Sequence, residues 1–107
     1  MIKVVTKKDK REYVAFEISG HANSGPYGFD LVCAAVSAIS FGAVNSLIAI
    51  SEIEPIIEQA NDGGYLYVEL PQSMTKDQMK KSQIIIESMI ISLETIEREY
   101  NQYIKIN

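Results

Sequence analysis

The stretch "DLVCAAVSAISFGAVNSLIAIS", from Asp30 to Ser51, decides the fold that we predict for this chain. Asp30 stands where a helix N-cap belongs, and the apolar run after it predicts a helix from about Leu31 to Ile50. About 20 uncharged residues could span a bilayer. However, a helix that is uncharged all round is also typical of a domain's covered central helix. Because the flanking segments read as strands that need a packing partner, we expect a covered helix and no membrane segment.

The sequence before this helix predicts a β-hairpin. Ile2–Thr6 is short, apolar and β-branched, and "KKDKR" follows as a polar turn. Glu12–Ser19 then alternates, so that Val14, Phe16 and Ile18 would share one face of a half-buried strand.

The sequence after this helix predicts a second hairpin, a second long helix and a final strand. The arms Ile56–Ala60 and Tyr65–Leu70 flank the turn "NDGG", whose residues tolerate positive φ. Thr75 and Gln78 form a capping box that begins the second helix, and "QYIKIN" closes the chain as a short strand. We therefore predict an α+β fold, one domain over residues 1–107 in the order ββαββαβ, with two long helices packed on a mostly antiparallel sheet.

Composition limits the classes of function. The chain has 107 residues, 47% apolar and 22% charged, with a net charge of −4, which suits one globular domain and argues against a nucleic-acid partner. A single cysteine cannot form an intrachain disulfide, which favours a reducing compartment. The N-terminal "MIKVVTKKDKREYVAF" has no signal-peptide pattern. We expect a cytoplasmic protein.

The only histidine and the only cysteine, His21 and Cys33, flank one glycine-rich loop at the predicted helix start. With Asp30 as N-cap, the Cys33 thiol lies near free N–H groups and the positive end of the helix dipole, which favour thiolate. His21 could act as base and then protonate a leaving amine. A lone cysteine is also commonly a small buried hydrophobe, and spacing alone leaves both interpretations open.

Other residues of this segment have two interpretations as well. Asp30 either only caps the helix or also orients His21. Ser37 lies four residues after Cys33 on the same helix face, where it positions substrate or thiolate, or simply packs. The loop glycines Gly25 and Gly28 are turn residues, or they let the backbone approach a substrate closely.

The sequence offers no pattern for a metal or phosphate group. One histidine and one cysteine cannot complete a zinc site without carboxylates, and neither C-x-x-C nor H-x-x-x-H occurs. The phosphate-loop and dinucleotide glycine motifs are also missing. We expect no cofactor and no metal.

"GHA" at Gly20–Ala22 and "G-x-D-x-V-C-A-A-V-S" at Gly28–Ser37 resemble the motif of the ribosomal-processing cysteine proteases called Prp. The resemblance extends over the whole chain in length and element order. It implies a small cytoplasmic bacterial protease that removes a short N-terminal extension from a large-subunit ribosomal protein, the one numbered twenty-seven. It also implies a homodimer with a Cys/His dyad.

The resemblance also assigns residues. The nucleophile of the family falls on Cys33 and its histidine on His21, while the motif's aspartate and serine fall on Asp30 and Ser37. The family's cleavage site is rich in bulky apolar and aromatic residues. Further loop residues are candidates for contacting such a substrate: Gly20, Gly25, Tyr27, Gly28 and Phe29.

Two other functions remain open on the sequence. One is a ribosome-associated module in which the same loop and helix start bind a peptide or an anion without cutting it. The other is a structural ribosome-associated protein in which Cys33 is part of the core. Homodimerisation is also predicted by the uncharged first helix and by the second, whose apolar stripe widens at Ile84–Ile86 and Met89–Ile91.

Overall fold

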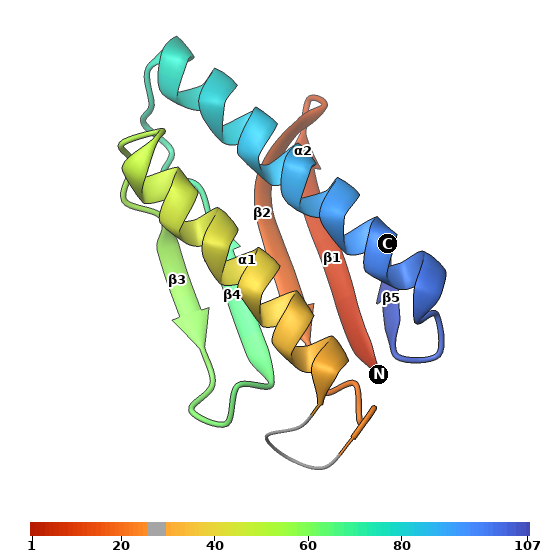
Figure 1. Ribbon diagram of the computed structural model, residues 1–107. Coiled ribbons are helices and arrows are strands. Elements are labelled where there is room, and N and C mark those ends of the chain that lie inside the picture. Colours follow the sequence, from red (N-terminus) through yellow and green to blue (C-terminus); the bar gives the residue numbers. More distant parts are fainter. Residues whose placement is uncertain (26–29) are drawn as a thin grey trace.

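The computed structural model describes residues 1–25 and 30–107. The predicted order ββαββαβ is confirmed (Figure 1). The bounds of the elements are β1 Ile2–Asp9, β2 Glu12–Ser19, α1 Leu31–Ala49, β3 Ile56–Gln59, β4 Tyr65–Glu69, α2 Lys76–Glu99 and β5 Ile104–Ile106.

The five strands form one mixed sheet in the order β3-β4-β2-β1-β5. Three of the four neighbouring pairs are antiparallel, as predicted. The exception is β5, which pairs parallel with β1 and places Ile104 opposite Ile2. The chain can reach this edge only after α2 has crossed the sheet, because a parallel neighbour needs a long connection.

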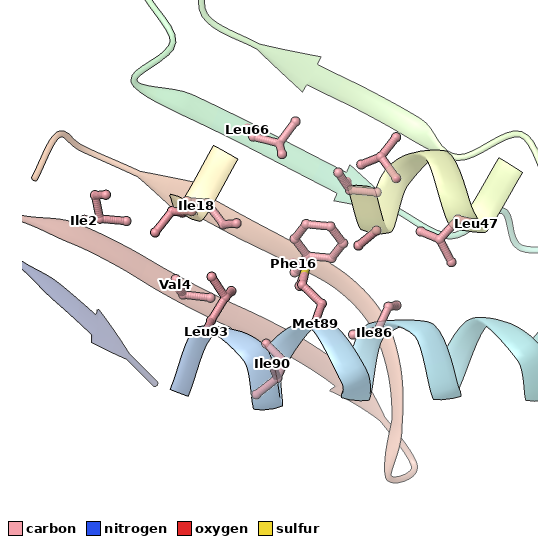
Figure 2. Close-up of a cluster of buried hydrophobic side chains, with 14 of the residues drawn as sticks. Ile2, Val4, Phe16, Ile18, Leu47, Leu66, Ile86, Met89, Ile90 and Leu93 are labelled. Carbon is pink, nitrogen blue, oxygen red and sulfur yellow. The ribbon is translucent and has the colours of Figure 1, made fainter. Parts of the chain in front are cut away.

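Both helices lie across the same face of the sheet, side by side (Figure 1). The core fills the space between the two layers, and Figure 2 shows Phe16 of β2 in one cluster with Leu47 of α1 and Met89 of α2. Phe16 and Ile18 are buried and Val14 is half-buried, in agreement with the predicted face of β2, while Ala15 of the other face is buried as well.

The helix starts follow from local capping chemistry. The Asp30 carboxylate accepts a hydrogen bond of 3.0 Å from the Cys33 N–H at the start of α1. At the start of α2, Thr75 and Gln78 exchange the two hydrogen bonds of a capping box. Each cap satisfies N–H groups that have no partner inside the helix, and both caps confirm the sequence prediction.

The expectation that α1 is covered on every side is wrong for the single chain. Its buried residues all lie on the inner side, whereas Leu31 is 79% exposed and Phe41 and Ile48 are also exposed. The physical reason is the layer arrangement, because the sheet and α2 cover one side of α1 and no further layer covers the other. Among the described residues, α1 is the one helix long and apolar enough to cross a membrane, a test that core helices of globular proteins also pass.

Candidate active site

The end of β2 positions His21. Gly20 follows the last strand residue with a φ of +92°, and a side chain there would collide with the carbonyl oxygen of Met1. The Gly20 N–H donates a 2.9 Å hydrogen bond to the Gly64 carbonyl in the turn between β3 and β4. The backbone before His21 is therefore fixed on both sides, while the imidazole itself is 46% exposed.

The first turn of α1 positions Cys33. Its thiol is partly buried, and the sulfur accepts a 3.3 Å hydrogen bond from the Ala22 N–H. Ala22 is the residue after His21, so this bond joins the nucleophile candidate directly to the segment that carries the histidine.

His21 and Cys33 line one cavity of about 670 Å³. The cavity brings together six of the residues predicted from the sequence. They are Gly20, His21, Gly25, Asp30, Cys33 and Ser37. Tyr27, Gly28 and Phe29, which were also predicted, lie outside the described residues.

The electrostatic environment of Cys33 differs from the sequence prediction. Burial raises the pKa of the Cys33 thiol, and the nearby Asp30 carboxylate raises it further, while the Ala22 N–H works in the opposite direction. The prediction of a helix start that lowers the thiol pKa is therefore wrong for the free chain. The physical reason is that the cap uses the Cys33 N–H and brings a negative charge beside the sulfur.

Asp30 is held firmly at this helix start. Burial alone would raise its pKa, but hydrogen bonds from the Cys33 amide and from the hydroxyl and amide of Ser24 outweigh burial. Together they hold the pKa of the Asp30 carboxyl well below its usual range. Asp30 thus caps α1 and ties the loop at Ser24 to it, and its hydrogen bonds go to these residues rather than to His21.

The imidazole of His21 faces the turn between β3 and β4. Its Nε2 lies 3.9 Å from Oδ2 of Asp62, a distance that makes an ion pair when the imidazole is protonated. Within residues 1–25 and 30–107, the hydrogen bonds include none between His21 and Cys33. The two residues therefore share a cavity without a hydrogen bond between them.

Sequence reasoning missed the contribution of β3 and β4 to this cavity. Gln59, Asp62 and Tyr65 line it from that side, and Phe41 of α1 lines it as well. The turn sequence indicated only positive φ and a hairpin, since no local pattern tells which distant loop a turn will face. No three metal-ligating side chains gather within the described part of the chain.

The comparisons with known proteins agree with this geometry. Residues 1–105 match the family model of the cysteine protease Prp. The chain belongs to the Prp family. The ribosomal processing cysteine protease Prp of Bacillus subtilis is 43% identical over 102 residues, covering 95% of this chain and 91% of the relative. The Prp of Staphylococcus aureus is 35% identical over 103 residues, covering 96% and 93%.

Solved structures share the fold over the whole chain. The crystal structure of an essential ribosomal processing protease Prp from S. aureus, in complex with a covalently linked product peptide, superposes with a TM-score of 0.88 at 35% identity. It covers 100% of this chain and 98% of that one. A Streptococcus mutans protein of known crystal structure gives a TM-score of 0.85 at 30% identity, covering 100% and 92%.

Proposed function

We propose that this chain is a cysteine endopeptidase that removes the short N-terminal extension of a large-subunit ribosomal protein, the one numbered twenty-seven. Cys33 is the nucleophile, and His21 is the base and proton donor. The observation that carries the proposal is the cavity that gathers the only cysteine and the only histidine in a chain of the Prp family. The S. aureus relative, which has been crystallised with a substrate peptide and with a covalently linked product peptide, supports it.

The reaction follows from the chemistry of the two side chains. His21 removes the proton from Cys33, and the thiolate attacks the carbonyl carbon of the scissile peptide bond. The C–N bond then breaks while the imidazolium of His21 gives its proton to the leaving amine, and a thioester remains on Cys33. A water molecule, deprotonated by His21, attacks the thioester and releases the new carboxyl end. The thiol regains its proton, and the cycle closes without a cofactor.

The raised thiol pKa explains why a base is needed. Burial and the Asp30 carboxylate keep Cys33 in the neutral form in the free chain at pH 7. Such a thiol is a weak nucleophile, so His21 must take its proton as the substrate binds. Since His21 and Cys33 make no hydrogen bond in the described structure, the imidazole must come within hydrogen-bond distance of the thiol when the substrate binds.

A cleavage assay tests the proposal. The purified chain is mixed under reducing conditions with the extended ribosomal protein, and the product is measured by mass spectrometry. We expect trimming at one site by the native chain and none by Cys33→Ala or His21→Ala. Absence of trimming by a folded native chain would refute the protease. Binding of the extension that survives both substitutions would instead support the non-catalytic peptide-binding module.

The proposal includes a homodimer in the cytoplasm. Its support is the apolar outer side of the helix layer, where Leu31, Phe41 and Ile48 of α1 and Ile84 and Ile91 of α2 are exposed. Apolar surface of this kind marks interaction sites. Light scattering at micromolar concentration should give twice the chain mass, and Ile48→Glu should lower it. A monomeric native chain would contradict the dimer. The unpaired cysteine supports the reducing compartment.

A further inference from the structure

We propose that Asp62 and Gly64, in the turn between β3 and β4, position His21 for its proton transfers. This inference rests on the proposed role of His21 as base and proton donor. It adds a third segment, far from the Gly20–Ser37 motif in sequence, to the two that carry the dyad. Figure 1 shows that this turn and the start of α1 lie at the same end of the sheet.

Gly64 packs closely against the imidazole of His21. A Cβ atom at Gly64 would lie 2.6 Å from Nε2 of His21 and 3.2 Å from its Cε1, so only glycine leaves room for the ring in this place. The backbone of Gly64 does not have the positive φ that by itself favours glycine. The space occupied by His21, rather than backbone conformation, is therefore what demands glycine here.

Asp62 supplies a charge with a defined orientation. Its Oδ1 accepts a 3.0 Å hydrogen bond from the Gly64 N–H, which leaves Oδ2 facing Nε2 of His21 at 3.9 Å. When His21 takes the thiol proton it becomes a cation, and a nearby carboxylate stabilises that cation. Both side chains line the cavity that contains Cys33, so the stabilised cation lies in the same cavity as the reacting sulfur.

The turn is anchored to the histidine segment. The Gly20 N–H donates to the Gly64 carbonyl at 2.9 Å, and Gly20 directly precedes His21. A shift of the turn would therefore move the backbone of both partners together. This anchoring makes the separation of Asp62 from His21 a property of the fold rather than of two independent loops.

Asp62→Asn tests the charge. The amide keeps an oxygen for the Gly64 N–H and removes only the negative charge facing His21. Because the pair is exposed, we expect kcat on the extended ribosomal protein to fall by about two- to fivefold, with KM unchanged. Asp62→Glu should restore part of the loss. Asp9→Asn, at the distant hairpin between β1 and β2, removes the same charge and should have no effect.

Gly64→Ala tests the close contact with the imidazole, and Gly42→Ala in α1 is its control. A Cβ at Gly42 meets nothing within 4 Å, and Gly42 does not line the cavity. Gly64→Ala should displace the imidazole and lower kcat by about 100-fold with little change in the unfolding midpoint. Gly42→Ala should leave kcat unchanged.

Proton NMR provides a readout that needs no cleavage, because the single histidine gives one pair of imidazole signals. We expect these signals to move in Asp62→Asn and Gly64→Ala and to stay in Asp9→Asn. Unmoved signals in both variants, or a kcat of Gly64→Ala within threefold of the native chain, would overturn the inference. If the native chain cuts nothing, the proposed function fails, and the NMR signals still decide whether Asp62 and Gly64 set the position of His21.

Discussion

Cys33 and His21, which line the same cavity, are held in place in different ways. At the start of α1, the Asp30 carboxylate accepts bonds from the Cys33 and Ser24 amides and the Ser24 hydroxyl, and the thiol accepts one from Ala22. The imidazole of His21, which lines the same cavity, is half-exposed and faces Asp62 across 3.9 Å. The Cys33 side of the cavity is therefore held by several hydrogen bonds and keeps the thiol neutral, whereas the imidazole of His21 is held by its close contact with Gly64 and by a carboxylate at 3.9 Å. The difference indicates that activation depends on the histidine reaching the sulfur.

The largest expected effect comes from the nucleophile itself. Cys33→Ser keeps the size of the side chain and its hydrogen bond from Ala22, but replaces the thiol with a far weaker acid and nucleophile. We expect kcat/KM on the extended ribosomal protein to fall by about 1,000-fold or more. The unfolding midpoint should stay close to that of the native chain. A variant that keeps a tenth of the native activity would show that Cys33 is not the attacking group.

The second largest expected effect comes from substitution of His21. His21→Gln removes the base and leaves the backbone at Gly20 and Ala22 unchanged. We expect kcat to fall by about 100- to 10,000-fold, the range for loss of a general acid–base group, with KM nearly unchanged. Single-turnover cleavage measures this directly, and Gln102→Ala near β5 serves as an unrelated substitution. Equal kcat for His21→Gln and the native chain would assign the base to another group.

A smaller effect concerns the pH dependence of Cys33 alkylation. Because burial and Asp30 raise the pKa of Cys33, alkylation of the thiol should be slow at pH 7 and rise through and above the ordinary thiol range. In Asp30→Asn the negative charge is gone, so the profile should move to lower pH. Iodoacetamide labelling followed by mass spectrometry gives both profiles. Fast labelling of the native chain at pH 6 would contradict a neutral resting thiol.

The smallest expected effect is on stability. The folded-state pKa of Asp30 is below its unfolded value, so the ionised carboxylate stabilises the fold above the unfolded pKa of about 3.9. This stabilisation disappears as the pH falls through the folded pKa. Asp30→Asn keeps a good N-cap without the charge and should cost about 0.3–1 kcal/mol at pH 7. Urea unfolding should show the gap closing toward low pH, and a gap that widens there would contradict the sign.

Much of the fold could be predicted because its signals are local. Alternation in Glu12–Ser19, the "NDGG" turn and the Thr75–Gln78 capping box depend on residues close in sequence. The motif around Cys33 likewise indicated that the only cysteine and the only histidine come near one another, and both line one cavity. Coverage of α1 could not be predicted, since an uncharged helix looks the same whether a further layer or a second chain covers it.

The sequence by itself determined the element order, the caps and the residues that can carry chemistry, because capping, turn and periodicity depend on neighbours along the chain. The tertiary structure alone decided three things. It buried the Cys33 thiol beside Asp30 and so raised its pKa, it paired β5 parallel to β1, and it brought Asp62 and Gly64 against His21. Each of these depends on burial or on contacts between segments distant in sequence, and the pairing of β2 with β4 is what brings the Asp62–Gly64 turn beside His21.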